Sequence, residues 1–289
     1  MRWYNPTVKK HVLLLPGLLF VIILVAYGLL QTIIESFTDP TSNQLSLANY
    51  IRLFEQTSFW DSLEFSLRVS FISTIFSLLI GTIVTKVLYE ALLKKYWKQL
   101  VWLPMLFPHF IAGYLVLLIF APSGLFSTWA YQVQLIEDMS QFPIIIMDRQ
   151  GVGIIQTYIW KEIPFVVLML LPVFAQIDNR YKEVVTTLGG GRWEMFRTVE
   201  WPWLFPVIIE TGLIVFAFVF AAFEVPYLLG ATYPKMLPVL AYQWFFEGDW
   251  SNRPLAMASM LLITAFIMMV ATMFFYLLQK KRYRMMRGN

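Results

Sequence analysis

Six long apolar segments dominate this chain and restrict what it can fold into. A helix needs about 20 mainly apolar residues to cross a hydrocarbon layer about 30 Å thick. Segments of that kind cover approximately residues 12–30, 69–93, 100–121, 152–176, 205–230 and 255–278. Long continuous runs fit helices, whereas the strands of membrane barrels alternate over about ten residues. The sequence therefore predicts an all-α polytopic membrane protein with six transmembrane helices.

The composition agrees with a protein whose surface faces lipid. Of the 289 residues, 58% are hydrophobic and only 14% are charged, whereas a soluble domain carries roughly 25% charged residues. No long polar stretch is present that would form a soluble domain, so we expect residues 1–289 to make a single transmembrane domain. The first apolar segment is longer than a usual signal-peptide core and no small-x-small cleavage site follows it. We therefore expect it to be a retained span.

The rare residue types exclude several kinds of chemistry. The chain has no Cys, and its only histidines are His11 and His109. Thiol catalysis and disulfides are thus excluded, and a metal site is not expected. The net charge of +4 is dispersed among loops, which does not resemble a nucleic-acid footprint. We expect no nucleic-acid partner and no catalytic residue in this chain.

The basic residues predict the orientation of the chain. Most Lys and Arg residues lie near the two termini, around residues 94–98 and in the loop after residue 177. The positive-inside rule makes this side cytoplasmic, so both termini are expected inside. Three long connections, at about residues 31–68, 122–151 and 231–254, then face outward. Their many aromatic residues fit either an interfacial belt or a surface that meets an external partner.

The predicted cytoplasmic loop between the fourth and fifth spans, residues 178–202, begins like a short amphipathic helix. Asp178 or Asn179 is a plausible N-cap. Apolar side chains then follow at helical spacing, at Tyr181, Val184, Val185 and Leu188. The glycines at 189–191 are expected to end this helix and to allow a sharp turn.

The second half of the loop predicts another short helix. Trp193, Phe196 and Val199 share one side of it, and Pro202 is expected to end it just before the next span. The whole loop thus exposes apolar and aromatic side chains on a cytoplasmic face. Such a surface fits a protein partner, and it also fits an amphipathic element that touches lipid headgroups. The pattern alone leaves both interpretations open.

The same loop resembles the EAA loop of permeases of binding-protein-dependent ABC importers, E-A-A-x3-G-x9-I-x-L-P. Glu183 stands at the Glu position, Gly189 at the Gly position and Pro202 at the final Pro. Val184 and Val185 replace the two Ala residues, Val199 replaces Ile, and Trp201 replaces Leu. Together with the six spans, the resemblance extends over nearly the whole chain.

The resemblance implies a fold, a role and a set of partners. The fold would be that of a type I ABC importer permease, whose cytoplasmic coupling helix inserts into a groove of an ATP-binding cassette subunit. The residues that would couple the chain to this ATPase are Glu183, Val184, Val185, Leu188, Gly189, Gly190, Arg192, Trp193, Phe196 and Pro202. Two ATPase copies, a second permease subunit forming a heterodimer, and an extracytoplasmic solute-binding protein would be its partners. The chain would be a multi-pass protein of the cytoplasmic (inner) membrane.

We expect ATP to be used by the partner and not by this chain. The chain has no G-x4-G-K-[ST] phosphate loop, because the glycines at 189–191 are followed by Arg192 and lack the Lys-Ser/Thr ending. The sequence therefore predicts a transport subunit that is not an enzyme and binds no cofactor of its own.

Ionisable residues within the spans are the candidates for the substrate path. They are Glu224, His109, Lys161 and Glu162. Glu224, near the outer end of the fifth span, fits either attraction of a cationic solute or a structural hydrogen bond. Lys161 and Glu162 point about 100° apart on a helix, so each is expected to pair across helices. His109 follows a proline and fits a kinked part of the third span, as a path residue or as a packed one.

Two further charged residues, Lys86 and Glu90, have i,i+4 spacing and are expected to form a local pair.

Short stretches give different indications about the cargo. Residues 222–230 and 253–258 resemble permeases of the polyamine, ferric-iron and thiamine-type group, whereas residues 158–165 also resemble sugar-type permeases. A polyamine-like or other small charged solute is favoured, and a sugar or oligosaccharide is the alternative. An ion-driven secondary transporter would show inverted halves, and an intramembrane enzyme would show a motif such as H-E-x-x-H. Neither pattern is found in the sequence.

Overall fold

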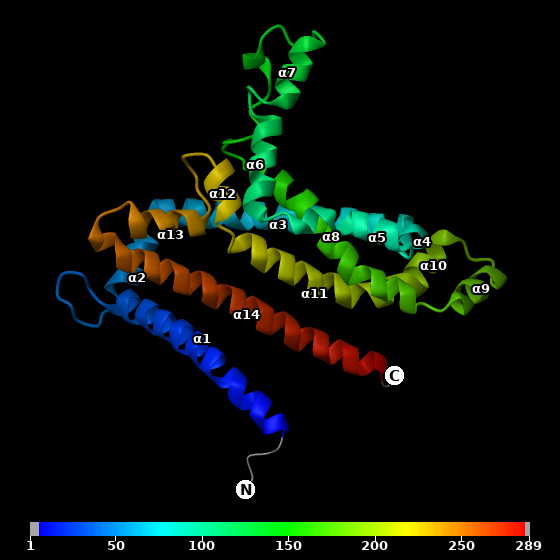
Figure 1. Ribbon diagram of the computed structural model, residues 1–289, viewed down its shortest axis with the longest axis horizontal. Coiled ribbons are helices and arrows are strands. Elements are labelled where there is room, and N and C mark those ends of the chain that lie inside the picture. Colours follow the sequence, from blue (N-terminus) through cyan, green and yellow to red (C-terminus); the bar gives the residue numbers. More distant parts are fainter. Residues whose placement is uncertain (1–5, 287–289) are drawn as a thin grey trace. The chain divides into compact units, whose positions relative to one another are not determined.

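The computed structural model describes residues 6–286, and it describes side chains for residues 14–276 except at positions 95, 98, 179 and 182. Helices make up most of this part of the chain (Figure 1). Within it no strand forms, and only one isolated bridge joins Thr38 to Leu45. The prediction of an all-α chain is confirmed.

Helices of very different lengths follow one another along the chain. The α-helices are α1 (Pro6–Phe37), α2 (Ala48–Glu55), α3 (Thr57–Val87), α4 (Tyr89–Leu92), α5 (Lys95–Trp102), α6 (His109–Phe120), α7 (Leu125–Gln132), α8 (Val152–Gln176), α9 (Asn179–Thr187), α10 (Arg192–Met195), α11 (Trp201–Phe220), α12 (Glu224–Leu229), α13 (Leu237–Phe246) and α14 (Arg253–Met286). The 3-10 turns are η1 (Leu103–Leu106), η2 (Met139–Gln141) and η4 (Trp250–Asn252), and η3 (Phe196–Glu200) is a π-helical turn.

Six helical segments among the described residues are long and apolar enough to cross a membrane. They are Leu14–Phe37, Thr57–Val87, His109–Gln132, Val152–Gln176, Arg192–Phe220 and Trp250–Tyr276. The number of predicted spans is thus confirmed, although several of their boundaries are not.

The contacts divide the chain into two compact units. The first runs to Thr57 and includes Leu240–Ala265, and the second comprises Ser58–Val239 with the chain from Phe266 onward. In the first unit, Asn49 of α2 ties that helix to the end of α1, because its Nδ2 donates to the carbonyls of Ser36 at 3.0 Å and Thr38 at 2.8 Å. All candidate site residues lie in the second unit.

Helix α8 forms the centre of the second unit. It is the most buried of the six candidate spans, and it contacts α6, α11 and α12. Ile154 and Tyr158 belong to one apolar cluster on it, and Val166 and Leu170 to another. Helix α8 thus contacts both α6 and α12, which carry candidate residues of the substrate path.

Glycines let α3 approach its neighbours closely. A Cβ atom at Gly81 would lie 2.6 Å from Cβ of Val166 on α8, and one at Gly212 of α11 would lie 2.9 Å from Cδ1 of Leu78. Small side chains at such contacts are typical of helices packed within a membrane, where dispersion contacts replace the hydrophobic effect. Helix α3 is thus held directly against α8 and α11.

The third span, predicted over residues 100–121 with a kinked part at Pro108, is fully broken there, and the segment long and apolar enough to cross a membrane begins only at His109. Helix α5 ends at Trp102, the η1 turn follows it and ends at Leu106, and α6 begins at His109. Phe107 is extended, with φ −82° and ψ 132°. Pro108 explains the break, because it has no N–H to donate and it disfavours helical geometry at the residue before it.

Two other predicted spans have different boundaries. The second begins at Thr57 rather than residue 69 and ends at Val87. The fifth begins at Arg192 rather than residue 205 and ends at Phe220 rather than residue 230. Hydropathy locates the apolar middle of a helix, whereas helical backbone bonds continue into the polar flanks.

Replacement of Gly81 by Ala should destabilise the chain, because the added methyl group collides with Val166. Overpacking of this kind costs about 1–3 kcal/mol. Gly28→Ala is the matched control, since a Cβ there has no neighbour within 4 Å and alanine is the better helix former. Thermal unfolding in detergent should show a lower midpoint for Gly81→Ala and an unchanged or higher one for Gly28→Ala. Equal midpoints would contradict this packing.

Candidate functional site

Helix α9 begins as the sequence predicts. Asp178 is its N-cap, and the carboxylate accepts from the backbone N–H of Arg180 at 2.9 Å and from its guanidinium Nη2 at 2.6 Å. The Arg180 side chain, and then its N–H, hold the pKa of Asp178 below its ordinary value of 3.8, because both stabilise the ionised carboxylate. The start of the loop is thus fixed by local charge-assisted hydrogen bonds.

The end of α9 is a Schellman turn centred on Gly189. Gly189 has φ +77°, a left-handed conformation that glycine adopts without strain. Its N–H donates to the carbonyl of Thr186 at 3.0 Å, and the N–H of Gly190 donates to the carbonyl of Val185 at 2.8 Å. The predicted glycine turn is confirmed, with left-handed backbone at Gly189 alone of the three glycines.

The other two glycines have different roles. A Cβ at Gly190 would lie 2.7 Å from Cγ1 of Val185, so a residue with a side chain does not fit there unless Val185 moves. The N–H of Gly191 donates to Oε2 of Glu194 at 2.9 Å, which caps the start of α10. The turn is therefore short and fully hydrogen-bonded rather than a loose linker.

The aromatic helix does not end at Pro202, which corrects the sequence prediction. Helix α10, the π-helical turn η3 and α11 run without interruption from Arg192 to Phe220. Pro202 lacks the N–H that an α-helix needs, and the π turn absorbs this defect, since the N–H of Trp201 reaches back to the carbonyl of Phe196. The second half of the loop is thus the first part of the fifth span.

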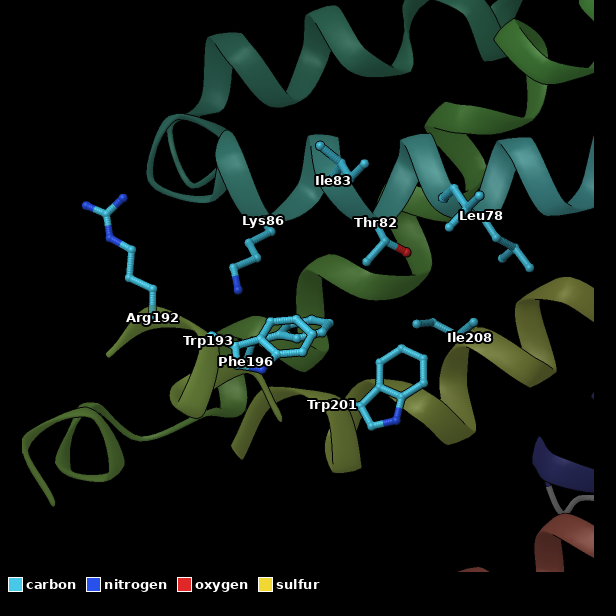
Figure 2. Close-up of a pocket in the computed structure, with 10 residues that line it drawn as sticks. Leu78, Thr82, Ile83, Lys86, Arg192, Trp193, Phe196, Trp201 and Ile208 are labelled. Carbon is cyan, nitrogen blue, oxygen red and sulfur yellow. The ribbon is translucent and has the colours of Figure 1, made fainter. Parts of the chain in front are cut away.

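A groove of 550 Å³ lies between the C-terminal part of α3 and this helix (Figure 2). Its wall is almost entirely apolar and is lined by Leu78, Leu79, Thr82, Ile83, Lys86, Arg192, Trp193, Phe196, Trp201 and Ile208. Figure 2 shows the side chains from α3 facing the aromatic rings across it. Consecutive ring contacts join Trp193, Phe196 and Trp201 at centroid distances of 5.8 Å each.

Lys86 links α3 to the loop. Its Nζ lies 2.6 Å from Oε2 of Glu200 and 4.4 Å from the centre of the Phe196 ring. The predicted local pair with Glu90 is therefore wrong. Helix α3 ends at Val87 and α4 starts at Tyr89, so the i,i+4 geometry is lost, and the lysine turns to a carboxylate across the groove.

Large apolar side chains of α9, of the residue that ends it and of α10 are open to solvent. Leu188 is 81% exposed, Trp193 65% and Val184 57%. Glu183 and Arg192 are also exposed. Large apolar side chains gathered in this way are typical of a surface that a partner covers. The role of these residues in ATPase coupling stays a prediction.

The residues proposed for the substrate path fall into two places. His109, Lys161 and Glu162 share a cavity of 210 Å³ with Met105, Phe165, Ile214, Val215 and Phe218. Nε2 of His109 lies 3.1 Å from Oε1 of Glu162, and Nζ of Lys161 donates to the carbonyl of Pro104 at 2.6 Å. The expected pairing across helices is confirmed. Glu224 does not line this cavity; it begins α12 and is exposed.

Sequence reasoning missed the aromatic surroundings of this cavity. The ring of His109 lies 4.6 Å from that of Phe218 and 6.4 Å from that of Tyr158. Tyr158 stands four residues before Glu162 on α8, so helical spacing alone places the two on one face. No spacing rule predicted Phe218, which comes from α11.

Residues 77–285 match the family model of the binding-protein-dependent transport system inner membrane component. The chain belongs to this family. Membership agrees with the six spans and makes the chain a multi-pass component of the inner membrane.

Relatives in the family have different cargoes in their names. The inner membrane ABC transporter permease protein YnjC of Escherichia coli (strain K12) is 27% identical over 87% of this chain and 48% of its own length. The thiamine transport system permease protein ThiP of the same strain is 22% identical over 86% and 44%. This chain therefore spans about half the length of these two relatives. The trehalose/maltose permease MalF of Thermococcus litoralis is 24% identical over 95% and 94%.

Solved structures confirm the fold. A chain of a bacterial ABC transporter involved in alginate import superposes with a TM-score of 0.75 at 18% identity, covering 94% of this chain and 95% of that one. A chain of the MetNI methionine ABC transporter gives a TM-score of 0.54 at 16% identity, over 82% and 99%. The predicted ABC importer permease fold is thus shown.

Loss of the lysine link should loosen the start of the fifth span. In Lys86→Met the side chain keeps its apolar stem but loses the charge that meets Glu200 and Phe196. We expect hydrogen exchange at residues 193–200 to become about two- to fivefold faster, which is the scale of one exposed cation–π contact. Lys94→Met is the matched control, and an equal effect of both substitutions would contradict the link.

The N-cap of α9 should titrate at low pH. A carboxyl whose pKa is lowered in the folded state stabilises the helix above its ordinary pKa of 3.8 and loses that effect as the pH falls through the lowered value. The amide resonance of Arg180, followed by NMR in nanodiscs, should be constant near neutral pH and shift only below about pH 4. Asp178→Asn retains a cap but cannot titrate, so the same shift in that variant would refute the assignment.

Proposed function

We propose that this chain is the permease subunit of an ATP-driven importer, which receives a small solute from an external binding protein and moves it into the cytoplasm. The main support is the exposed apolar side chains of α9 and α10: α10 is continuous with the fifth span, and the hydrogen-bonded turn at Gly189 joins α9 to α10. A protein that pushes on Leu188 and Trp193 would move α11 without an intervening flexible joint. Membership in the family of binding-protein-dependent transport components also supports this proposal.

The proposed coupling works through three connections. The Schellman turn fixes how α9 projects from α10, so a push on α9 is not absorbed at the glycines. The unbroken helix from Arg192 to Phe220 carries the displacement along α11. The contact of Lys86 with Glu200 carries part of it to α3, whose C-terminal part forms the other wall of the groove. Two spans would thus respond together to one docking event.

The partners follow from this role. The assembly would contain two copies of an ATP-binding cassette subunit, one of which would dock on the loop, a second permease subunit that completes the transport path as a heterodimer, and an extracytoplasmic binding protein that delivers the solute. Both termini would lie in the cytoplasm, as the distribution of Lys and Arg indicates. ATP would be bound and hydrolysed by the partner, since this sequence has no phosphate loop.

For the cargo we propose a small charged solute, with a polyamine-like cation as the first candidate. The support is the carboxylate of Glu224, which is exposed and does not line the polar cavity around His109. A sugar is the second candidate, supported by the likeness to the trehalose/maltose permease MalF over nearly the full length of both chains. Competition of uptake by spermidine or by maltose in membranes that contain the cognate binding protein would separate the two.

The function is tested most simply at Gly189. A Cβ there meets no atom within 4 Å, so any effect comes from the left-handed backbone. Val disfavours this conformation strongly, whereas Asn tolerates it. We expect Gly189→Val to lower ATP-dependent uptake about tenfold or more while the protein still inserts in the membrane, because each non-glycine left-handed residue costs about 1–2 kcal/mol and the helix must project accurately.

Gly189→Asn is the matched control and should retain most of the uptake. Normal uptake by Gly189→Val would count against coupling through this loop. Uptake that persists in vesicles without any ATPase partner would instead support an ion-driven secondary transporter.

A further inference from the structure

The break in the third span leaves a backbone carbonyl without its normal donor. In a continuous α-helix the carbonyl of Pro104 would accept from the N–H of residue 108. Residue 108 is proline and has no N–H. A carbonyl that is left unpaired in apolar surroundings is strongly unfavourable.

Lys161 supplies the missing donor from the neighbouring helix. Its Nζ donates to the carbonyl of Pro104 at 2.6 Å, and the residue is only 4% exposed. A buried ammonium group is itself unfavourable unless it is paired. The lysine and the carbonyl therefore satisfy each other, and neither would be tolerated in this position alone.

Glu162 contacts the other side of the same break. It is 7% exposed, and its Oε1 lies 3.1 Å from Nε2 of His109, the first residue of α6. The N-terminal end of a helix carries partial positive charge, and the C-terminal end carries partial negative charge. Consecutive residues of α8 thus place a cation at the carbonyl side of the break and a carboxylate at the amide side.

Both halves of the broken span contact α8, and each half also packs against an element of its own. Helix α6 contacts α12, where a Cβ at Gly113 would lie 3.4 Å from Leu228. Helix α5 contacts α4, and its Val101 packs on the cluster that contains Leu92. A change in angle between the halves would therefore move α12 relative to α4.

We propose that Lys161 and Glu162 are positioning residues that clasp the two halves of the third span, and that the break at Phe107 and Pro108 is a hinge used during transport. The second part rests on the proposed function. Each side chain contacts the protein itself, through Nζ of Lys161 at the carbonyl of Pro104 and through Oε1 of Glu162 at Nε2 of His109, which supports a positioning role.

A compensating substitution tests the clasp in the complete transporter. Lys161→Met leaves the carbonyl of Pro104 unpaired and should shift the unfolding equilibrium about tenfold or more. Pro108→Ala restores an N–H at position 108 and frees Phe107 to become helical. In the Pro108→Ala background, Lys161→Met should therefore lower the midpoint of thermal unfolding much less. An equal loss in both backgrounds would overturn the clasp.

A conservative variant separates hydrogen bonding from packing. Lys161→Arg keeps donors that can reach the carbonyl and should be close to wild type in thermal stability, whereas Lys161→Met should not. If Arg is as damaging as Met, the lysine acts by its shape and the assignment fails.

Transport measurements then test the hinge. Pro108→Ala should stiffen the third span, so ATP-dependent uptake should fall severalfold while thermal stability and co-purification with the ATPase are retained. Wild-type uptake by this variant would overturn the hinge. A wild-type chain without any ATP-dependent uptake would instead refute the proposed function, and the stability comparison at positions 108 and 161 would still decide on the clasp.

Discussion

The requirement that every backbone polar group inside a membrane find a partner within the protein governs this structure. Unbroken helices meet the requirement by themselves, and most of the chain takes that solution. Two prolines, Pro202 and Pro108, show how the requirement is met where the backbone N–H is missing. At Pro202 the helix meets the requirement with one π-helical turn, and at Pro108 it does so with a lysine from the neighbouring span.

These two solutions have opposite mechanical consequences. The π turn keeps the helix continuous, so α10 and the fifth span form one helix, to which the turn at Gly189 joins α9. The break at Pro108 interrupts the backbone, so the third span has two halves that side chains of α8 hold together. The continuous helix of the fifth span and the broken third span both pack on α8.

Much of the fold could be predicted from the sequence, because the signals were local. Six apolar segments of bilayer length gave the number of spans, Asp178 gave a helix start, and Gly189 gave a helix end. The motif spacing in the loop also led to the family, which the family model confirms.

The parts of the fold and of the site that the sequence did not predict depend on contacts between residues far apart in the sequence. Lys86 pairs with Glu200, 114 positions away, where local spacing favoured Glu90. Hydropathy over residues 100–121 predicted one span, and Pro108 indicated a kink there but not a complete break of the helix. The cavity that joins His109 to Phe218 forms only when α6, α8 and α11 are packed, so no pattern along one helix could reveal it.

The exposed end of α9 is the surface that we propose an ATPase subunit covers. The chain contains no Cys, so a single Leu188→Cys substitution provides a unique attachment point. A short bifunctional cross-linker applied to native membranes should join this position to an ATP-binding cassette subunit, with a yield that changes when ATP is added. Protection of the cysteine by lipid, with no cross-link to any nucleotide-binding protein, would contradict the account.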